Sequence, residues 1–476
     1  MSPEDRRRPA PATRWWWMLG GSFALAGLSL LVLPRSVAYD PWSWLIWGRE
    51  ITHLDLNTRA AATAVKPLPI AFTTLFARTG VAPILWLVVA RAAALLSFAV
   101  TFQLARRYAG VWAGLVAAVC LASADQYLGY LFMRGMSEPM ATAAVLAAID
   151  NHLDGRRRVA LGALVAAGLL RPEVWPFLFL YALWLAWPRT WRWRVAAACL
   201  GIAVPLSWFM IDVVGAHQFF RSASAATHQS QGGPLLSREP GLATIRETWQ
   251  LISPVVVTLF LLAVAVAIVR WWRTGRAGPT IWFSAGAVSW LLVDAVLAQG
   301  HFATGASRYL LPGAALACVV VGIFVADAVR WVAGALHGRR GAAVATVAVA
   351  VVVAAVLVPD MVTTARQVRQ GALLGRRFER LQSTLKQAVT LGGGRAAILR
   401  CGPVSTQNFQ VPMVAWQLHL HLDQVQYTVP DPADGTVIAQ GTTPRIPAQV
   451  SSGYTKLGTV GSGDHAWTVF TACPPR

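Results

Sequence analysis

The chain has 476 residues, of which 56% are hydrophobic and only 13% are charged, whereas a soluble domain carries about 25% charged residues. Too few charged side chains are available to cover a large soluble surface, so the composition excludes a chain of several soluble domains. The net charge of +20 does not indicate a nucleic-acid-binding protein, because the arginines stand in short clusters between apolar runs and form no single stripe.

Eleven apolar runs are predicted to cross a membrane as helices, because lipid requires each backbone amide to bond within its own segment. The first run, at about 15–34, follows four arginines, and no small-residue cleavage site follows it, so it is a helix and not a signal peptide. The others lie near 81–104, 111–128, 137–151, 158–170, 173–187, 195–212, 251–270, 279–298, 309–329 and 341–359. The predicted fold class is a polytopic α-helical membrane protein, with a transmembrane domain over 1–359.

The arginine clusters between these runs predict the topology. All of them fall on one side in short loops, and such loops are cytoplasmic by the positive-inside rule. The N-terminus is then cytoplasmic, and after eleven spans the C-terminus is extracytoplasmic. The clusters are Arg106–Arg107, Arg156–Arg158, Arg189/Arg192/Arg194, Arg270/Arg273/Arg276 and Arg330/Arg339/Arg340.

Three segments are predicted outside the membrane on the opposite face. Two are long loops over 35–80 and 213–250, and the third is a small α+β domain over 360–476. In that domain we expect an amphipathic helix near 363–390, a glycine turn at 392–394 and β-strands near 396–401, 425–429 and 465–472. Cys401 and Cys473 flank its polar part, and extracytoplasmic cysteines form disulfides, so we expect this pair to be joined.

The first outer loop carries the main catalytic candidates. Pro41 preceded by Asp40 predicts a helix start, and the nearby tryptophans, with Trp44 among them, favour the membrane interface. Two interpretations remain open: Asp40 caps the helix and the tryptophans only anchor it, or Asp40 is the base that a glycosyl transfer to a hydroxyl requires. Glu50 and Asp55 are the other acidic candidates in this loop.

Cations could bind an anionic group at the same face. Only three lysines occur in the chain, and one of them, Lys66, closes the first outer loop. It either marks the membrane interface or stabilises the charge that develops on a leaving phosphate. Further ionisable residues lie within or at the outer ends of helices, where they face a cavity or pair with each other: Arg91, Arg134, Glu138, Arg171, Glu173, Asp294 and Arg308.

No metal-binding motif is evident. His419 and His421 are two residues apart and lack a third ligand, so we expect them to be surface histidines. The chain also has no Walker loop, no GxGxxG and no nucleophile elbow, which excludes an ATP-driven transporter.

Several motifs together resemble the GT-C superfamily of glycosyltransferases. The likeness is greatest to the branch that contains lipid A aminoarabinose transferase and the protein O-mannosyltransferases, in which a first helix ends in an Asp-containing motif and a Lys-Pro-Pro-Leu-like motif closes the first outer loop. It covers roughly residues 35–312. The matching segments are Lys66-Pro67-Leu68-Pro69, Ala90-Arg91-Ala92, Leu170-Arg171-Pro172-Glu173 and Arg308-Tyr309-Leu310-Leu311-Pro312.

The resemblance implies an inverting transfer from a polyprenyl-phosphate sugar, with no cofactor firmly predicted and room for a divalent cation. It implies Asp40 as the base and a donor phosphate near Lys66, Arg308, Arg171 and Arg134. Tyr39, Trp44, Glu138, Glu173 and Tyr309 would line the substrate cavity. The chain departs from the family at two positions: Pro41 replaces a second acid after Asp40, and Val65 precedes Lys66 where relatives carry Glu or His. Either Asp55 or Glu50 supplies the second acid, or the branch is divergent.

The arginine-rich and lysine-poor composition is typical of GC-rich bacterial genomes. By analogy, a bacterial plasma-membrane enzyme would transfer arabinose or mannose to an envelope glycan, a glycolipid or a protein during cell-wall biogenesis. The alternatives are a non-catalytic assembly protein with the same fold and a transporter or flippase of lipid-linked sugars. A transporter predicts inverted repeats, and the sequence contains none that we can detect.

Overall fold

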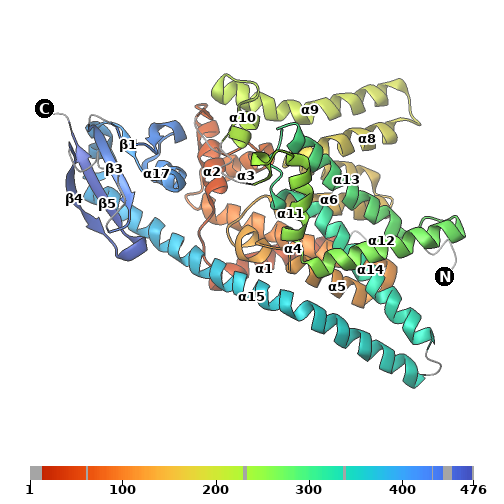
Figure 1. Cartoon of the computed structure of the whole chain (residues 1–476). Helices are drawn as coiled ribbons and strands as arrows, with labels where there is room; N and C mark the ends of the chain where they lie inside the picture. The colour runs from red at the N-terminus through yellow and green to blue at the C-terminus, as the bar shows by residue number, and fades with distance from the viewer. Residues whose placement is uncertain are drawn as a thin grey trace.

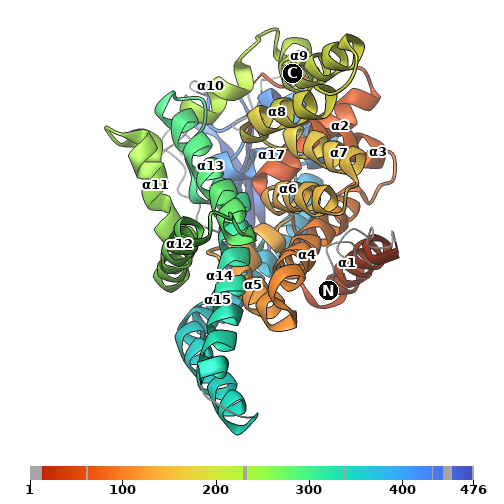
Figure 2. The same cartoon turned by 90° about the vertical axis from the view of Figure 1, so that its right-hand side faces the viewer.

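The computed structural model describes residues 13–59, 63–228, 233–335, 339–430, 433–442 and 453–473. A helical bundle forms most of the molecule, and a small sheet with short helices lies beside one end of it (Figure 1). Viewed along the bundle, α1 and α12 lie on opposite flanks (Figure 2).

The helices of the bundle follow each other with short connections. The short elements η3, η4 and η5 are 3₁₀-helices and η2 is a π-helix. In chain order they are α1 (Thr13–Val32), α2 (Tyr39–Thr52), α3 (Pro67–Phe76), α4 (Ala82–Ala109), α5 (Val111–Ala122), η2 (Tyr127–Phe132), α6 (Glu138–Leu153), α7 (Arg157–Gly168), η3 (Pro172–Val174), α8 (Trp175–Ala186), α9 (Trp191–Ala216), α10 (Arg221–His228), η4 (Pro234–Leu236), α11 (Pro240–Leu251), α12 (Pro254–Thr274), α13 (Pro279–Gln299), η5 (Ser307–Leu310), α14 (Leu311–Ala335) and α15 (Arg339–Leu391).

The predicted membrane helices all fall on helices of the structure. Among the described residues, six helical segments have the length and apolar character of a membrane span: α1, α4, α9, α12, α13 and η5 with α14. The other five predicted runs coincide with the shorter helices α5, α6, α7 and η3–α8 and with the first part of α15. The prediction of a multi-pass helical protein is thus confirmed, and six of its spans have sufficient length by themselves.

Ion pairs define one end of the bundle. Arg14, in the first turn of α1, reaches Asp150 at 2.6 Å and Asp154 at 2.9 Å near the C-terminus of α6, and Arg107 at the end of α4 pairs with the same two acids. Both aspartates are almost fully buried, and a buried carboxylate needs such partners to remain charged. The first arginine clusters therefore meet at the end of α6 that is farthest from Glu138.

A single 53-residue helix, α15, runs along the bundle to the sheet (Figure 1). It contains Pro359, so the separate amphipathic helix expected at 363–390 is the continuation of the last apolar run. The helix crosses η2 at two glycines: a Cβ on Gly371 would lie 1.9 Å from the carbonyl oxygen of Gly129. Only glycine permits this approach of two backbones.

The C-terminal region contains a five-stranded mixed sheet in the order β2-β1-β3-β5-β4. In this sheet β1 is parallel to β2 and β3, while β5 is antiparallel to β3 and β4. Its elements are α16 (Gly394–Cys401), β1 (Val404–Ser405), η6 (Asn408–Gln410), α17 (Val411–Leu418), η7 (Leu422–Gln424), β2 (Val425–Gln426), β3 (Gly435–Gln440), β4 (Thr455–Val460), η8 (Gly463–His465) and β5 (Trp467–Ala472).

One strand prediction in this region is wrong. Residues 396–401 lie in α16, because alanine and leucine favour a helix and because Ile398 and Cys401, three residues apart, are both buried on one helical face. The strands expected near 425–429 and 465–472 are present. The Sγ atoms of Cys401 and Cys473 are joined in a disulfide, which ties the end of α16 to the end of β5.

Candidate functional site

Asp40 lies in the first turn of α2, two residues after the helix N-cap Ala38. It therefore does not cap the helix, although an acid in the first turn is favoured by the helix dipole. One carboxylate oxygen, Oδ1, accepts a hydrogen bond from Thr63 at 3.2 Å. The side chain remains 21% exposed, so a ligand can approach this carboxylate.

Lys66 is buried and directly precedes α3. Its Nζ donates to the Ser137 hydroxyl at 2.7 Å, lies 3.5 Å from Glu138 Oε1 and stands 5.2 Å above the Trp44 ring. Trp44 is fully buried, so it backs the lysine and does not line an open cavity. The ammonium group is fixed by a hydroxyl, a carboxylate and an aromatic face.

Helices α9 and α10 hold the segment that leads to Lys66. The backbone amide of Val65 donates to Ser222 Oγ at 3.1 Å, and both the amide and the hydroxyl of Ser222 donate to Asp212. Arg221 also donates to the Thr63 carbonyl at 3.3 Å. These bonds link α9 and α10 to Thr63 and Val65, just before Lys66, and fix the position of this segment.

Arg308, in η5, connects the two carboxylates. Its Nε lies 3.6 Å from Glu138 Oε1, and its Nη2 lies 4.0 Å from Asp40 Oδ2 and 3.3 Å from the Tyr309 hydroxyl. The arginine side chain is 34% exposed, whereas Glu138 is 1% exposed. The guanidinium therefore has one face toward a buried acid and another that solvent or a ligand can reach.

Arg171 adds a third cation, which also contacts the Tyr309 ring. Its guanidinium carbon stands 3.5 Å from the centre of the Tyr309 ring, and both its Nε and Nη2 donate to Glu173. Trp290 of α13 holds the backbone of Tyr309 through a hydrogen bond of 3.0 Å to its carbonyl. Arg171, Glu173, Tyr309 and Arg308 thus form a row at the ends of η3 and η5.

The charges of this cluster differ in how well they are satisfied. Within the part of the chain that the structure describes, neither oxygen of Glu138 accepts a hydrogen bond, although Lys66 and Arg308 lie within 4 Å. Arg308 Nε also lacks a hydrogen-bond acceptor there. A buried polar atom without a partner is costly, and here the nearby Lys66 and Arg308 cations offset the burial of the Glu138 carboxylate.

Two predicted catalytic residues, Glu50 and Asp55, lie elsewhere. Glu50 accepts a hydrogen bond from the amide of Asn57 at 2.9 Å and contacts His421 Nδ1 at 2.8 Å, while Asp55 lies 3.1 Å from His421 Nε2. His421 is therefore no solitary surface histidine, because it joins α2 and the residues after it to the C-terminal region. Burial raises the pKa of Glu50 to about 7, against the lowering effect of the bonds from Asn57 and His421. Neither acid contacts Asp40.

Arg134 and Arg91 support the loop before α2. Arg134 donates to the Val37 carbonyl at 2.8 Å and stacks 4.2 Å from the Phe378 ring of α15. Arg91 donates to the carbonyls of Pro34 and Met133. Both guanidinium groups are used by the backbone that positions Asp40, and neither joins the row of Arg308 and Arg171.

Sequence reasoning missed three residues of the site: Thr63, Ser137 and Tyr130. Thr63 donates a hydrogen bond to Asp40, and Ser137 accepts one from Lys66. Ser137 could have been found from the sequence, because it directly precedes the ionisable residue Glu138. Tyr130 of η2 lies near Asp40 and Arg308, and burial, followed by the charge of Asp40, raises its pKa. A tyrosine in an apolar run carries no local signal for such a role.

An apolar cavity of about 500 Å³ begins beside the cluster. It lies between α6, α7, α8, α13 and α14, and Val174 and Trp290 form part of its wall. Val174 follows Glu173, and Trp290 binds the Tyr309 carbonyl, so the cavity adjoins the row of arginines. In the described residues no group of three or more His, Cys, Asp or Glu side chains is arranged to hold a metal ion.

Comparison with known proteins identifies the fold. The structure is similar to a crystal structure of ArnT from Cupriavidus metallidurans bound to undecaprenyl phosphate, with a TM-score of 0.54 and 14% sequence identity over 98% of this chain and 100% of that chain. It is equally similar to ArnT in the apo state, with a TM-score of 0.55 and 12% identity over the same shares. No protein-family model matches the sequence, and no curated protein matches it either. The chain therefore has the fold of ArnT, in line with the resemblance that the motifs indicated.

Proposed function

We propose that this chain is a membrane glycosyltransferase that takes a sugar from a polyprenyl-phosphate donor. The observation that carries the proposal is the pairing of a partly exposed carboxylate, Asp40, with the partly exposed guanidinium of Arg308 at 4.0 Å. A base and a phosphate-binding cation are then adjacent, with the buried Lys66–Glu138 pair behind them. The related fold of ArnT, whose crystal structure contains undecaprenyl phosphate, supports a lipid-linked donor.

In this reaction Asp40 acts as the base, and the nearby cations stabilise the leaving group. Asp40 accepts the proton of the acceptor hydroxyl while that oxygen attacks the anomeric carbon of the donor sugar. The bond between the anomeric carbon and the phosphate oxygen breaks, and polyprenyl phosphate leaves with the bonding electrons. Arg308, with Lys66 and Arg171 nearby, stabilises this developing charge, as preorganised cations do for phosphate leaving groups. Attack opposite the leaving group inverts the anomeric centre.

The lipid tail of the donor has a suitable place beside this cluster. The cavity of about 500 Å³ is lined mainly by aliphatic and aromatic side chains, and isoprenoid units bury apolar surface there at roughly 25 cal/mol per Å². Its wall touches the segment that carries Arg171 and Glu173. A chain in this cavity would leave its phosphate at the row of arginines.

We further propose the orientation and the acceptor side. The arginine clusters gather at the end of the bundle away from Asp40, and the positive-inside rule assigns that end to the cytoplasm. Asp40 and residues 360–476 then face the extracytoplasmic side, where the C-terminal region forms a domain that positions a glycan, lipid or protein acceptor. Arabinose and mannose are the donor sugars to try first, with no cofactor added.

Sugar transfer by the purified full chain from a panel of radiolabelled polyprenyl-phosphate sugars tests this function. Asp40→Asn should lower the rate by about 10²- to 10⁴-fold, the contribution of a general base, while Asp55→Asn, in the same loop but 72% exposed, should retain activity. Equal activity in Asp40→Asn and wild type would remove Asp40 as the base. Lipid binding without transfer from any donor would favour a non-catalytic protein or a flippase.

A further inference from the structure

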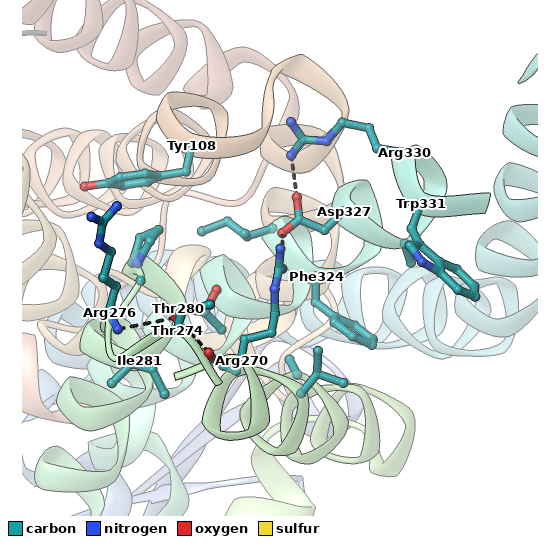
Figure 3. A pocket seen from close by; sticks show the side chains of 17 residues that line it. Tyr108, Arg270, Thr274, Arg276, Thr280, Ile281, Phe324, Asp327, Arg330 and Trp331 are labelled. Carbon is teal, nitrogen blue, oxygen red and sulfur yellow. Dashed lines mark hydrogen bonds and ion pairs between the residues drawn. The ribbon is translucent and has the colours of Figure 1, made fainter. Parts of the chain in front are cut away.

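A large cavity lies at the end of the bundle opposite to the candidate site. It has a volume of about 1340 Å³ and is lined by the ends of α4, α12 and α14 and by the start of α13 (Figure 3). Asp327 is 19 residues after Arg308 along η5 and α14. At 1.5 Å per residue this separation is about 28 Å, close to the roughly 30 Å hydrocarbon thickness of a bilayer. The cavity therefore lies at the other membrane face.

The mouth of this cavity carries an excess of positive charge. Arg270, Arg276 and Arg330 line it, and Asp327 is the one acid among the lining residues that the structure describes. The Asp327 carboxylate forms ion pairs with two of these arginines, at 2.5 Å from Arg330 Nη2 and 3.7 Å from Arg270 Nη1. Arg276 extends toward Tyr108 on the facing wall (Figure 3). Three guanidinium groups around one carboxylate leave a net charge of +2.

The walls change from polar to apolar in a regular way. Along α12 the lining residues run from Ala263 and Val266 to Arg270 and Thr274, and along α14 they run from Ile323 and Phe324 to Asp327 and Arg330. On both helices the apolar residues lie toward the middle of the bundle and the charged ones at its end. A small anion needs only the charged rim, whereas an amphiphile uses both parts.

We propose that this cavity binds an anionic phospholipid of the leaflet opposite to the sugar-transfer site. The phosphate group takes hydrogen bonds from Arg276, Arg330 and Arg270, because guanidinium groups match phosphate oxygens in a bidentate fashion. An acyl chain lies against Val266 and Phe324. A volume above the roughly 300–1000 Å³ of an ordinary small-molecule pocket favours a lipid over free phosphate. This site is independent of the proposed glycosyl transfer.

Native mass spectrometry of the delipidated full chain, titrated with phosphatidylglycerol or phosphatidylcholine, tests the proposal. Wild type should bind the anionic lipid at least 10-fold more tightly. The double substitution Arg276→Gln/Arg330→Gln should weaken that binding about 30-fold, equivalent to about 2 kcal/mol for two arginines near an anionic surface. Replacement of the same two arginines by Lys keeps the charges but not the bidentate geometry, so its affinity should lie between those of wild type and the Gln variant.

The matched control is Arg192→Gln/Arg194→Gln, which removes the same charge from the arginine cluster at the start of α9, outside the cavity. It should leave the affinity unchanged. Equal losses in both double variants would show general surface attraction and overturn the site. Displacement of the lipid by millimolar inorganic phosphate would assign the arginines to free phosphate, and equal affinity for the two lipids would refute a role for the charges.

Discussion

The buried Lys66–Glu138 pair allows a quantitative test of the cluster. Lys66→Met removes the ammonium that lies 3.5 Å from Glu138 and leaves Arg308 as the remaining cation within 4 Å of that carboxylate. At an effective dielectric constant of 20 the lost attraction is roughly 5 kcal/mol, and breaking a buried pair on one side costs about 3–5 kcal/mol. Because Arg308 remains, we expect a loss of about 3 kcal/mol in unfolding free energy.

The same charge argument predicts the effect of the partner. Glu138→Gln leaves Lys66 and Arg308 beside a neutral amide, so it should also cost about 3 kcal/mol. The double variant removes both ends of the pair and should cost about the same as either single variant, which corresponds to a coupling energy of roughly 3 kcal/mol, at the upper end of measured pairs.

Equilibrium unfolding of the four proteins in mixed detergent micelles at pH 7 measures this cycle. Lys386→Met is the control, since Lys386 is exposed on α15 and should change stability by less than about 0.5 kcal/mol. Additive costs for Lys66→Met and Glu138→Gln, near 6 kcal/mol in total, would show that the two side chains act independently and would refute the reasoning.

Three further predictions concern the outer loop, the sheet and the long helix. Burial raises the pKa of Glu50 to about 7. The protonated carboxyl therefore stabilises the fold fully below about pH 4.5, and this contribution, roughly 3 kcal/mol at 1.4 kcal/mol per pKa unit, is lost as the pH rises through 7. Glu50→Gln should make the melting temperature less dependent on pH over this window, and the same pH dependence as in wild type would contradict this. Cys473→Ser opens a loop of 72 residues and should cost up to about 4 kcal/mol of stability. The loss should appear as faster proteolysis of the sheet. If wild type resisted protease equally with and without reductant, the disulfide would not stabilise the sheet. Gly371→Ala should lower the free energy of unfolding by about 1–3 kcal/mol through overpacking. Gly334→Ala is the control, because a Cβ there would meet open space, and it should have no effect. Equal melting temperatures of the two variants would exclude a tight crossing of α15 and η2.

Much of the helical fold follows from the sequence alone, because apolar runs are local signals. The run at 341–359 ends at Pro359, however, and the backbone continues as one helix to Leu391. The sequence changes from apolar to polar at Pro359, but the helix does not end there. Hydropathy therefore predicts a helix end where the backbone has none. At 396–401 short-range pattern was ambiguous between strand and helix, and burial on one helical face decided it.

The candidate site was predictable in part. Asp40, Lys66, Glu138, Arg171 and Arg308 were predicted at one face because they stand in the first outer loop or at the outer ends of predicted helices. In the structure Arg308 contacts Asp40 and Glu138, Lys66 contacts Glu138, and Arg171 joins them through the Tyr309 ring. The partners of the remaining charges were not predictable, because a loop carboxylate has no local signal that selects a distant histidine.

The contact between the first outer loop and the C-terminal region has a consequence for biosynthesis. Glu50 and His421 are 371 residues apart, and Arg49 of the same helix donates to the carbonyls of Trp416 and Leu420. A ribosome that adds about 5–20 residues per second needs roughly 20–70 s to supply these partners after α2 has emerged. During that time Trp42, which packs 5.8 Å from Trp416, has no cover from the sheet region. The helix that carries Asp40 is thus among the first segments to be synthesised and among the last to acquire its final contacts.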